Sequence, residues 1–350
     1  MTKQAKQLII LVLVLGACIG AYFGLRAWNQ SKEDEEAAAL QAEVIRLAEL
    51  TDITSISFEN AGTVLSFEKQ DGTWVYTDNT DFPLDVTYIE TIETLLADLQ
   101  AVSSYEDADT LEAYGLDSPS YQLTAETKGG ESFQIYIGDL TGSYYYARVE
   151  GSDAVYTIEE DLVTGISYEL VDLVELETFP TLSEENLESV TFSIGNLTLT
   201  KNTTATDMEV EQDTGEVDEN GDAIYETVTQ TNYTYTWYIG DIETGQEISS
   251  DNTILTGLLD ALPLLSFSSC YNYAPDDAAF AACGLDDNAT KITIEYAEGT
   301  VVLLIGNAAG EDGSYYATLE RSDKIYIMSS TYTSVLLNVD ETGLTADSEA

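Results

Sequence analysis

Apolar residues form one long continuous run near the start of the chain and later recur in short alternating segments. Leu8–Leu25 is a run of 18 residues without a charged side chain. At about 1.5 Å per residue, a helix of this length spans roughly 27 Å, close to the hydrocarbon thickness of a bilayer. The apolar core of a cleavable signal peptide has only about 7–15 residues, so this run predicts an uncleaved transmembrane signal anchor. We place the anchor within residues 1–29.

Residues 30–50 have the pattern of a polar helix. Four consecutive acids, Glu33–Glu36, suit the positive end of a helix dipole, and Leu40, Val44 and Leu47 recur at helical spacing. The pattern predicts an acidic helical stalk. Its narrow apolar stripe either packs on the chain's own first domain or contacts a partner helix.

Beyond residue 50 the same pattern occurs twice. Matching segments stay nearly in register, 168 to 170 residues apart, which predicts two tandem copies over residues 51–180 and 181–340, followed by an acidic tail at 341–350. The matches are Tyr114–Asp117 with Cys283–Asp286, Ile137-Gly138 with Ile305-Gly306, Tyr145–Ala147 with Tyr315–Ala317, and Ser152-Asp153 with Ser322-Asp323.

Each copy combines short alternating runs, typical of strands, with one run of helical periodicity. The main helices are expected near residues 85–100 and 252–262, and a short helix near 160–168. Runs of strands with one main amphipathic helix per copy favour an antiparallel α+β fold over alternating β-α units. The strands expected in the first copy are Ile53–Glu59, Thr63–Lys69, Thr73–Tyr76, Tyr121–Glu126, Ser132–Ile137, Tyr144–Val149 and Ala154–Ile158.

The second copy carries an insertion at residues 201–232, rich in threonine and acids. Its Asn220-Gly221 pair lies between the strand-like runs Met208–Val217 and Ala223–Val228. Asn-Gly is the preferred sequence of a two-residue hairpin turn. The insertion therefore predicts a projecting β-hairpin.

The charges that flank the apolar run predict the orientation of the anchor in the membrane. Lys3 and Lys6 precede the apolar run and favour a cytoplasmic N-terminus, although Arg26 and Lys32 on its far side reduce the difference. We therefore expect a single-pass protein of the cell membrane with most of the chain outside the cytoplasm. A second route to the same location is lipidation, because Leu15–Cys18 resembles a lipobox and Cys18 would then be acylated.

The net charge of −52, from 64 acidic and 12 basic residues, excludes classes of partner. Such a field repels nucleic acid, since binding to phosphate backbones requires clustered lysine and arginine. The chain has no histidine, which removes Ser-His-Asp catalysis, His-based zinc sites and the commonest general base. No pair of carboxylates stands out among so many, so we expect neither an enzyme nor a cofactor.

Two groups of residues remain as candidate sites. Glu216, Asp218 and Asn220 have the spacing of a calcium loop, but Thr227 occupies the position that requires a bidentate glutamate, and the flanks are strand-like. They are therefore only a candidate divalent-cation site. Cys270 and Cys283 lie 13 residues apart and either form a disulfide or occupy core positions.

The motifs taken together resemble a bacterial family, domain of unknown function 4340, and its Firmicutes members most. The resemblance covers roughly residues 50–340, once per copy. It implies an accessory role at a membrane complex such as an ABC-type transport system, and it assigns no catalytic or binding residue. The motifs that resemble the family are Phe82–Asp85, Tyr114–Asp117, Ile137–Asp139 and the Tyr-Tyr-Ala strand, together with the anchor and the Thr73-Trp74 strand.

Two functions agree with these features. The first is an extracytoplasmic accessory or scaffold protein that presents an acidic surface to transporter subunits or another membrane complex. The second is a ligand-binding module for divalent cations or cell-wall glycans. The membrane itself is the partner expected for Leu8–Leu25.

Overall fold

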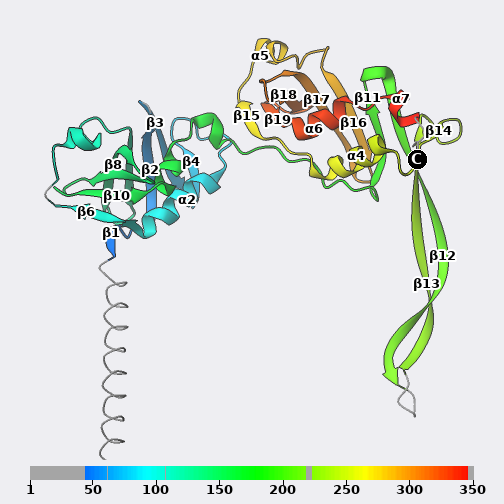
Figure 1. The fold of residues 1–350 in the computed structure, drawn as a ribbon, viewed down its shortest axis with the longest axis horizontal. Coiled ribbons are helices and arrows are strands. Elements are labelled where there is room, and N and C mark those ends of the chain that lie inside the picture. The colour runs from blue at the N-terminus through cyan, green and yellow to red at the C-terminus, as the bar shows by residue number, and fades with distance from the viewer. Residues whose placement is uncertain (1–43, 61, 107, 218–222, 346–350) are drawn as a thin grey trace, which may run out of the picture. The chain divides into compact units, whose positions relative to one another are not determined.

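The computed structural model describes residues 44–345 except 61, 107 and 218–222 (Figure 1). The expected anchor, Cys18 and the stalk up to residue 43 lie outside the described residues. Within that described part, no helix combines the length and the apolar character needed to cross a membrane. The chain divides into two compact units: the first ends at Ser167 and omits Asp81–Val86, and the second contains Asp81–Val86 together with the chain from Tyr168 onward.

The first unit is built on an eight-stranded antiparallel sheet in the order β4-β3-β2-β7-β8-β9-β10-β6. Its helices are α2 (Val86–Ala97), α3 (Asp161–Ile166) and the short 3-10 turn η1 (Leu111–Tyr114). The strands are β2 (Ile53–Asn60), β3 (Thr63–Gln70), β4 (Thr73–Tyr76), β6 (Ser103–Tyr105), β7 (Tyr121–Thr127), β8 (Ser132–Thr141), β9 (Tyr144–Val149) and β10 (Val155–Glu159).

Apolar periodicity explains how this unit is assembled. Ile89, Ile92 and Leu96 of α2 are fully buried, and their spacing of three and four places them on one helix face. In β2 the buried Ile56 and Phe58 alternate with partly exposed neighbours, as one covered sheet face requires. The α+β architecture and the strands expected from the alternation are confirmed.

The structure corrects the prediction that the helical stalk continues to residue 50. Residues Ile45–Ala48 form strand β1, which pairs with β5 (Leu99–Ala101), so the predicted helix does not extend through them. Ala48 and Leu50 are buried, and the amide of Leu50 donates to the carbonyl of Leu96 at 3.1 Å. Backbone pairing with a segment about fifty positions later therefore outweighs the local helical spacing.

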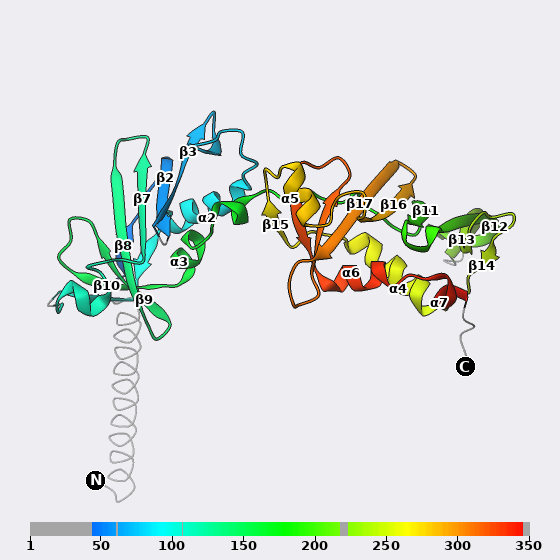
Figure 2. The same ribbon diagram turned by 90° about the horizontal axis from the view of Figure 1, so that it is seen from above.

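The second unit contains a nine-stranded antiparallel sheet in the order β14-β13-β12-β11-β16-β17-β18-β19-β15. Helices α4 (Thr253–Ala261) and α6 (Ser330–Leu337) lie together on one side of it (Figure 2). The other elements are β11 (Leu187–Phe192), β12 (Leu197–Val217), β13 (Ala223–Ile239), β14 (Gln246–Glu247), β15 (Ser269–Asn272), β16 (Thr290–Tyr296), β17 (Gly299–Ala308), β18 (Tyr315–Leu319), β19 (Ile325–Met328), α5 (Asp277–Ala282) and α7 (Glu341–Thr345).

The first half of the expected acidic tail is helix α7. Leu344 of α7 is buried, and the side-chain amide of Asn252, which caps α4, donates to the carbonyls of Gly343 and Leu344. Only residues 346–350 of the predicted tail lie outside the described part. Leu344 and the Asn252 amide thus connect this acidic segment to the rest of the unit.

The second sheet repeats the strand order of the first, with β14 added at one edge. The repeated glycines explain part of the sequence match. A Cβ atom on Gly138 would lie 2.2 Å from the carbonyl oxygen of Tyr114, and one on Gly306 would lie 2.1 Å from that of Cys283. Each Gly-Leu-Asp turn therefore packs directly on a bulge of the neighbouring strand, where only glycine fits.

Asp81–Val86 belongs to the second unit although its sequence lies in the first copy. Leu84 forms an antiparallel bridge with Val174, and the amide of Glu175 donates to the carbonyl of Pro83 at 2.8 Å. Phe82 packs edge-on against Tyr273, with ring centroids 5.0 Å apart. The contacts also place residues 168–180, expected in the first copy, with the second unit.

Candidate functional site

Strands β12 and β13 extend well beyond the second sheet as a two-stranded ribbon (Figure 1). Strand β11 pairs with β12 only as far as Thr200, and β14 pairs only with Tyr238 and Ile239 of β13. We define the ribbon as residues 203–216 and 223–235. It confirms that the insertion forms a hairpin, while the turn at Asn220-Gly221 lies outside the described residues.

One face of the ribbon is acidic. Cross-strand partners in an antiparallel pair point to the same side, and alternate residues share a face. Asp207, Glu209, Glu211 and Asp213 are therefore aligned on one face, and we call it the acidic face. They lie opposite Thr231, Thr229, Thr227 and Tyr225, respectively.

The other face of the ribbon is nearly uncharged, and we call it the neutral face. Val210 and Val228 pair across it and are the partly shielded side chains in an otherwise exposed stretch. Next to them, Met208 lies opposite Gln230, and the amide of Asn232 donates to the Met208 sulfur at 3.5 Å. Two valines give the ribbon very little apolar packing of its own.

At the base of the ribbon the acidic face leads to aromatic residues. Tyr233, Tyr235 and Trp237 alternate along β13 on that face, from 58% exposed at Tyr233 to 2% at Trp237. The indole Nε1 of Trp237 donates to Glu184 at 3.1 Å. This alternation takes the same face from open solvent into the core within five residues.

Lys201 lies beside these rings. Its ammonium is 4.6 Å from the centroid of Tyr235 and donates to the backbone carbonyls of Glu184 and Glu185 at 2.6 and 2.7 Å. Burial lowers the pKa of Lys201, while the nearby glutamates oppose that shift. The pKa of Tyr235 is raised by desolvation and then by the carboxylates of Glu185 and Glu184. Lys201 is thus a cation already held by this aromatic face.

A cleft of about 640 Å³ opens where the aromatic residues meet helix α4. Tyr233, Tyr235 and Trp237 line one side, and Leu255 and Leu259 of α4 line the other. Its polar groups are the carboxylates of Glu184, Glu247 and Asp260 and the hydroxyls of Ser249, Ser250 and Thr256. Aromatic walls with carboxylates favour an uncharged polar or a cationic ligand over an anion.

The first unit has the same anchoring arrangement without the ribbon. Lys69 lies opposite Trp74 across β3 and β4, as Lys201 lies opposite Trp237. The ammonium of Lys69 bonds both carboxylate oxygens of Glu93, at 2.6 and 2.8 Å, and the Trp74 indole donates to the same carboxylate at 3.1 Å. In both units, therefore, a lysine lies opposite a tryptophan whose indole donates to a glutamate.

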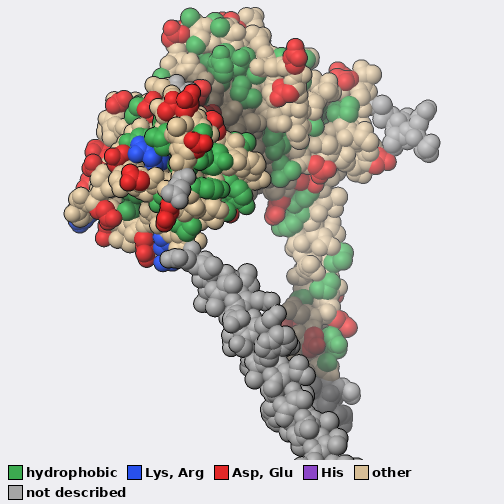
Figure 3. Space-filling model, turned by 60° about the vertical axis from the view of Figure 1, so that its left-hand side comes forward, with side chains coloured by type: hydrophobic (Ala, Val, Ile, Leu, Met, Phe, Trp, Pro, Cys, Tyr) green, Lys and Arg blue, Asp and Glu red, His purple; other side chains and the backbone are tan. Residues whose placement is uncertain are grey.

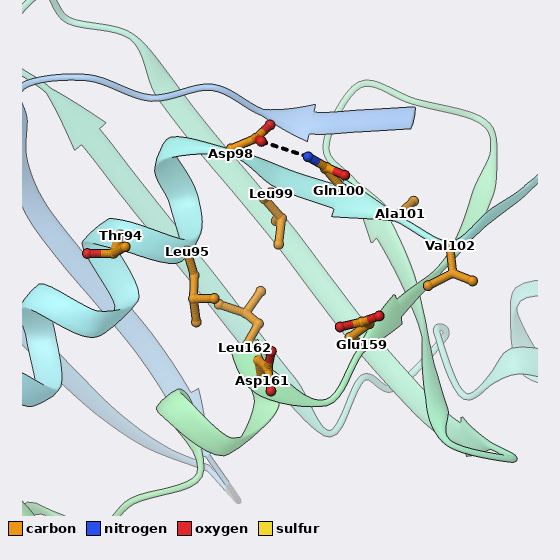
Figure 4. A pocket seen from close by; sticks show the side chains of 10 residues that line it. All are labelled: Thr94, Leu95, Asp98, Leu99, Gln100, Ala101, Val102, Glu159, Asp161 and Leu162. Carbon is orange, nitrogen blue, oxygen red and sulfur yellow. Dashed lines mark hydrogen bonds between the residues drawn. The ribbon is translucent and has the colours of Figure 1, made fainter. Parts of the chain in front are cut away.

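A second cleft, of about 460 Å³, lies at the end of α2 in the first unit (Figure 4). Leu95, Leu99 and Leu162 form its apolar part, with Asp98 and Glu159 at its rim. The carboxylate of Asp98 accepts from Arg46 at 2.7 Å and from Gln100 at 2.6 Å, and these bonds lower its pKa. Asp98 is thus already engaged within the protein.

The sequence-predicted metal site remains a prediction. Glu216 is exposed at the end of β12, whereas Asp218 and Asn220 lie outside the described residues. In the part of the chain that is described, no three acidic or cysteine side chains are grouped as a metal site requires. Acidic side chains are instead spread over the visible surface with few basic ones between them (Figure 3).

Cys270 and Cys283 are free, buried thiols in the structure. The Cys270 thiol donates to the carbonyl of Ile325 at 3.7 Å, and Cys283 packs in a core cluster with Leu285 and Ile325. Burial raises the pKa of Cys270 to about 11 and also raises that of Cys283. Of the two alternatives, the structure has the core packing.

The sequence reasoning missed the cleft. Its local signal was the alternation of Tyr233, Tyr235 and Trp237, which places three aromatic side chains on one strand face. The opposite wall comes from α4, about twenty residues further along, and no local pattern brings the two together.

Comparison with known proteins gives a match to the family described as Domain of unknown function (DUF4340), over residues 74–234 and 237–342. The two matched segments begin at Trp74 and Trp237, the equivalent tryptophans of the two units. No curated protein and no solved structure matches the chain.

Proposed function

We propose that this chain, which belongs to the DUF4340 family, is a membrane-anchored extracytoplasmic scaffold or accessory protein. In this proposal the ribbon contacts a partner complex. The observation that supports this most is the ribbon itself. An isolated two-stranded hairpin is only marginally stable in water, and beyond the base at Tyr235 the described part of this one has only the partly shielded pair Val210 and Val228. A long, exposed ribbon is best explained as one half of an interface.

The remaining parts of the proposal come from the sequence. Leu8–Leu25 is the anchor that holds the protein at the membrane, and the two units are copies of one α+β domain. The second unit has gained the ribbon, so the copies have separate tasks: the first is nearest the anchor in sequence, and the second makes the contact. The partner proposed from the family resemblance is an ABC-type transport system.

The test is co-purification of the full-length chain from membranes solubilised in a mild detergent. The matched variant replaces residues 205–233 by Asn-Gly, which joins Thr204 to Thr234 through a two-residue hairpin turn. We expect the wild type to recover transporter subunits or another defined assembly in a fixed ratio, and the shortened variant to lose them. Recovery of the protein alone by both, in several detergents, would contradict the proposal.

The cleft at the ribbon base supports a second candidate, a binding module for glycans. Its volume of about 640 Å³, the exposed Tyr233 ring and the serine hydroxyls suit a sugar, which stacks on aromatic rings and exchanges hydrogen bonds with polar groups. Calorimetric titration of the full chain with cell-wall fragments, and separately with calcium, tests this function. A flat titration with the fragments would exclude glycan binding, and a flat titration with calcium would exclude the divalent-cation alternative.

A further inference from the structure

The carboxylates of the acidic face are spaced at a regular interval that the side chains of a second extended polypeptide can match. Alternate residues of a strand lie about 6.6–6.8 Å apart on one face. Asp207, Glu209, Glu211 and Asp213 therefore form a row of evenly spaced carboxylates, and an extended segment presents every second side chain at the same interval.

The charges of this row are not compensated within the described part of the chain. The ribbon contains no lysine or arginine, and none of the four carboxylates is in an ion pair there. Thr231 donates to Asp207 at 2.7 Å, and the amide of Gly215 donates to Asp213 at 2.9 Å. These neutral donors leave the negative field of the face in place, so the complementary partner is a cation.

The aromatic end of the same face is suited to a cation as well. The ammonium of Lys201 already lies 4.6 Å from the ring of Tyr235, which shows that this wall accepts a positively charged side chain. Tyr233, which is 58% exposed, continues the row toward the carboxylates. The acidic row and the exposed tyrosine thus form one continuous surface.

We infer that the acidic face, from Asp213 to Tyr233, is the docking surface for an extended cationic segment of the partner, with lysine or arginine at alternate positions. This inference rests on the proposed scaffold function and names the chemistry of its partner. The segment's basic side chains pair with the four carboxylates, and the residue nearest the base stacks on Tyr233. The docked segment also covers one face of the ribbon and so supplies the packing partner that an isolated two-stranded hairpin lacks.

The neutral face is the less suitable surface for the same purpose. Its apolar groups near the centre are Val210, Val228 and Met208, flanked mostly by amides and hydroxyls. Glu226, opposite Gln212, is the one charged residue among the pairs from Thr204–Thr234 to Gln212–Glu226, so this face has no row of charges to direct a partner. It could cover the equivalent face of a second copy, and that occupant is distinguished by the test below.

The probe is a fluorescent decapeptide of alternating lysine and threonine, titrated into the full-length chain in an uncharged detergent and followed by anisotropy. A peptide of identical composition, with its lysines in one block, controls for spacing. We expect the alternating peptide to bind at least about tenfold more tightly than the blocked one, and added salt to weaken the binding.

Two variants with the same change in net charge separate the face from the overall field. The first is Asp207→Asn, Glu209→Gln, Glu211→Gln, Asp213→Asn. The control is Asp117→Asn, Glu131→Gln, Asp287→Asn, Glu311→Gln, at exposed sites outside the ribbon. We expect the ribbon variant to lose at least about tenfold in affinity and the control less than about twofold.

Four results would overturn the inference. The first is equal binding of the two peptides, and the second is an equal loss in the two variants. The third is a ribbon-dependent dimer in sedimentation, which would assign the ribbon to a second copy. The fourth is co-purification of the partner complex with the ribbon variant as well as with the wild type, which excludes the acidic face while the scaffold function stands.

Discussion

The side-chain amide of Asn252 donates to the backbone carbonyl of Gly343 at 2.9 Å, across 91 residues of sequence. The same side chain caps helix α4 by accepting from the amides of Ile254 and Leu255, both at 3.0 Å. One buried residue therefore fixes the start of α4 and the C-terminal helix α7 together.

Replacing this residue should loosen both helices. Asn252→Ala removes the cap and leaves buried backbone groups without partners, so we expect a loss of about 1–3 kcal/mol. Hydrogen exchange in α4 and α7 measures it. Asn252→Asp keeps the capping acceptor but not the donor, and should deprotect α7 more than α4. Equal protection of α7 in all three proteins would show that the bond to Gly343 contributes nothing.

Phe82→Ala should destabilise the second unit, although the residue lies in the first copy. Phe82 is 6% exposed and packs edge-on against Tyr273. Loss of a buried phenylalanine costs about 3–5 kcal/mol. Faster exchange in β15, next to Tyr273, is the measurement, with the exposed Thr80→Ala as the control. If exchange rises only in the first sheet, the assignment of residues 81–86 to the second unit is wrong.

The two Lys-Trp-Glu groups should respond differently to loss of the carboxylate. Glu93→Ala removes the acceptor of both Lys69 and Trp74, whereas Glu184→Ala leaves Lys201 bonded to backbone carbonyls. We expect a cost of about 1–3 kcal/mol in the first unit and a smaller one in the second. Urea unfolding followed by tryptophan fluorescence compares them. A larger effect of the Glu184 change would contradict this account.

Gly306→Ala and Gly257→Ala should have opposite effects in the same unit. A Cβ at Gly306 would lie 2.1 Å from a carbonyl oxygen, so we expect destabilisation of about 1–3 kcal/mol or more. Gly257 lies within α4 with open space around it, and alanine there should stabilise the unit by about 0.5–1 kcal/mol. Thermal unfolding of the two variants checks both signs.

Cys270 and Cys283 should resist alkylation in the folded protein. Burial raises the pKa of Cys270 to about 11 from an ordinary value of 9.0. The folded state therefore gains stability below pH 9, and that contribution is lost as the pH rises through about 11. Mass spectrometry after iodoacetamide treatment should find both thiols unmodified at pH 8 and modified in urea. A disulfide-linked peptide pair would instead restore the other alternative left by their spacing.

Much of the fold could be predicted because its signals are local. The alternation of polar and apolar residues located β2, β3, β4 and β9 within one residue of their ends, and Asn-Gly located the ribbon. Strand β1 could not be found this way, because it is short and its partner β5 lies about fifty residues later. The two strands form a separate two-stranded sheet, and pairing at that distance is not contained in a local window of sequence.

The candidate site was less accessible from the sequence for the same reason. The acidic row from Asp207 to Asp213 is visible as an alternation, but its meaning depends on register, since a slip by one residue would move it to the other face. The cleft also needs Leu255 and Leu259 of α4 opposite Tyr233 and Tyr235. Neither relationship is determined by neighbours in sequence.

The position of Asp81–Val86 in the second unit sets an order of events during synthesis. This segment leaves the ribosome long before Val174 and Tyr273, the residues against which Leu84 and Phe82 pack. It must therefore wait as an open loop while the chain that follows is made. The second unit cannot complete its core until Asp81–Val86, which is synthesised much earlier, packs against it. The folding of the two units is therefore coupled in time.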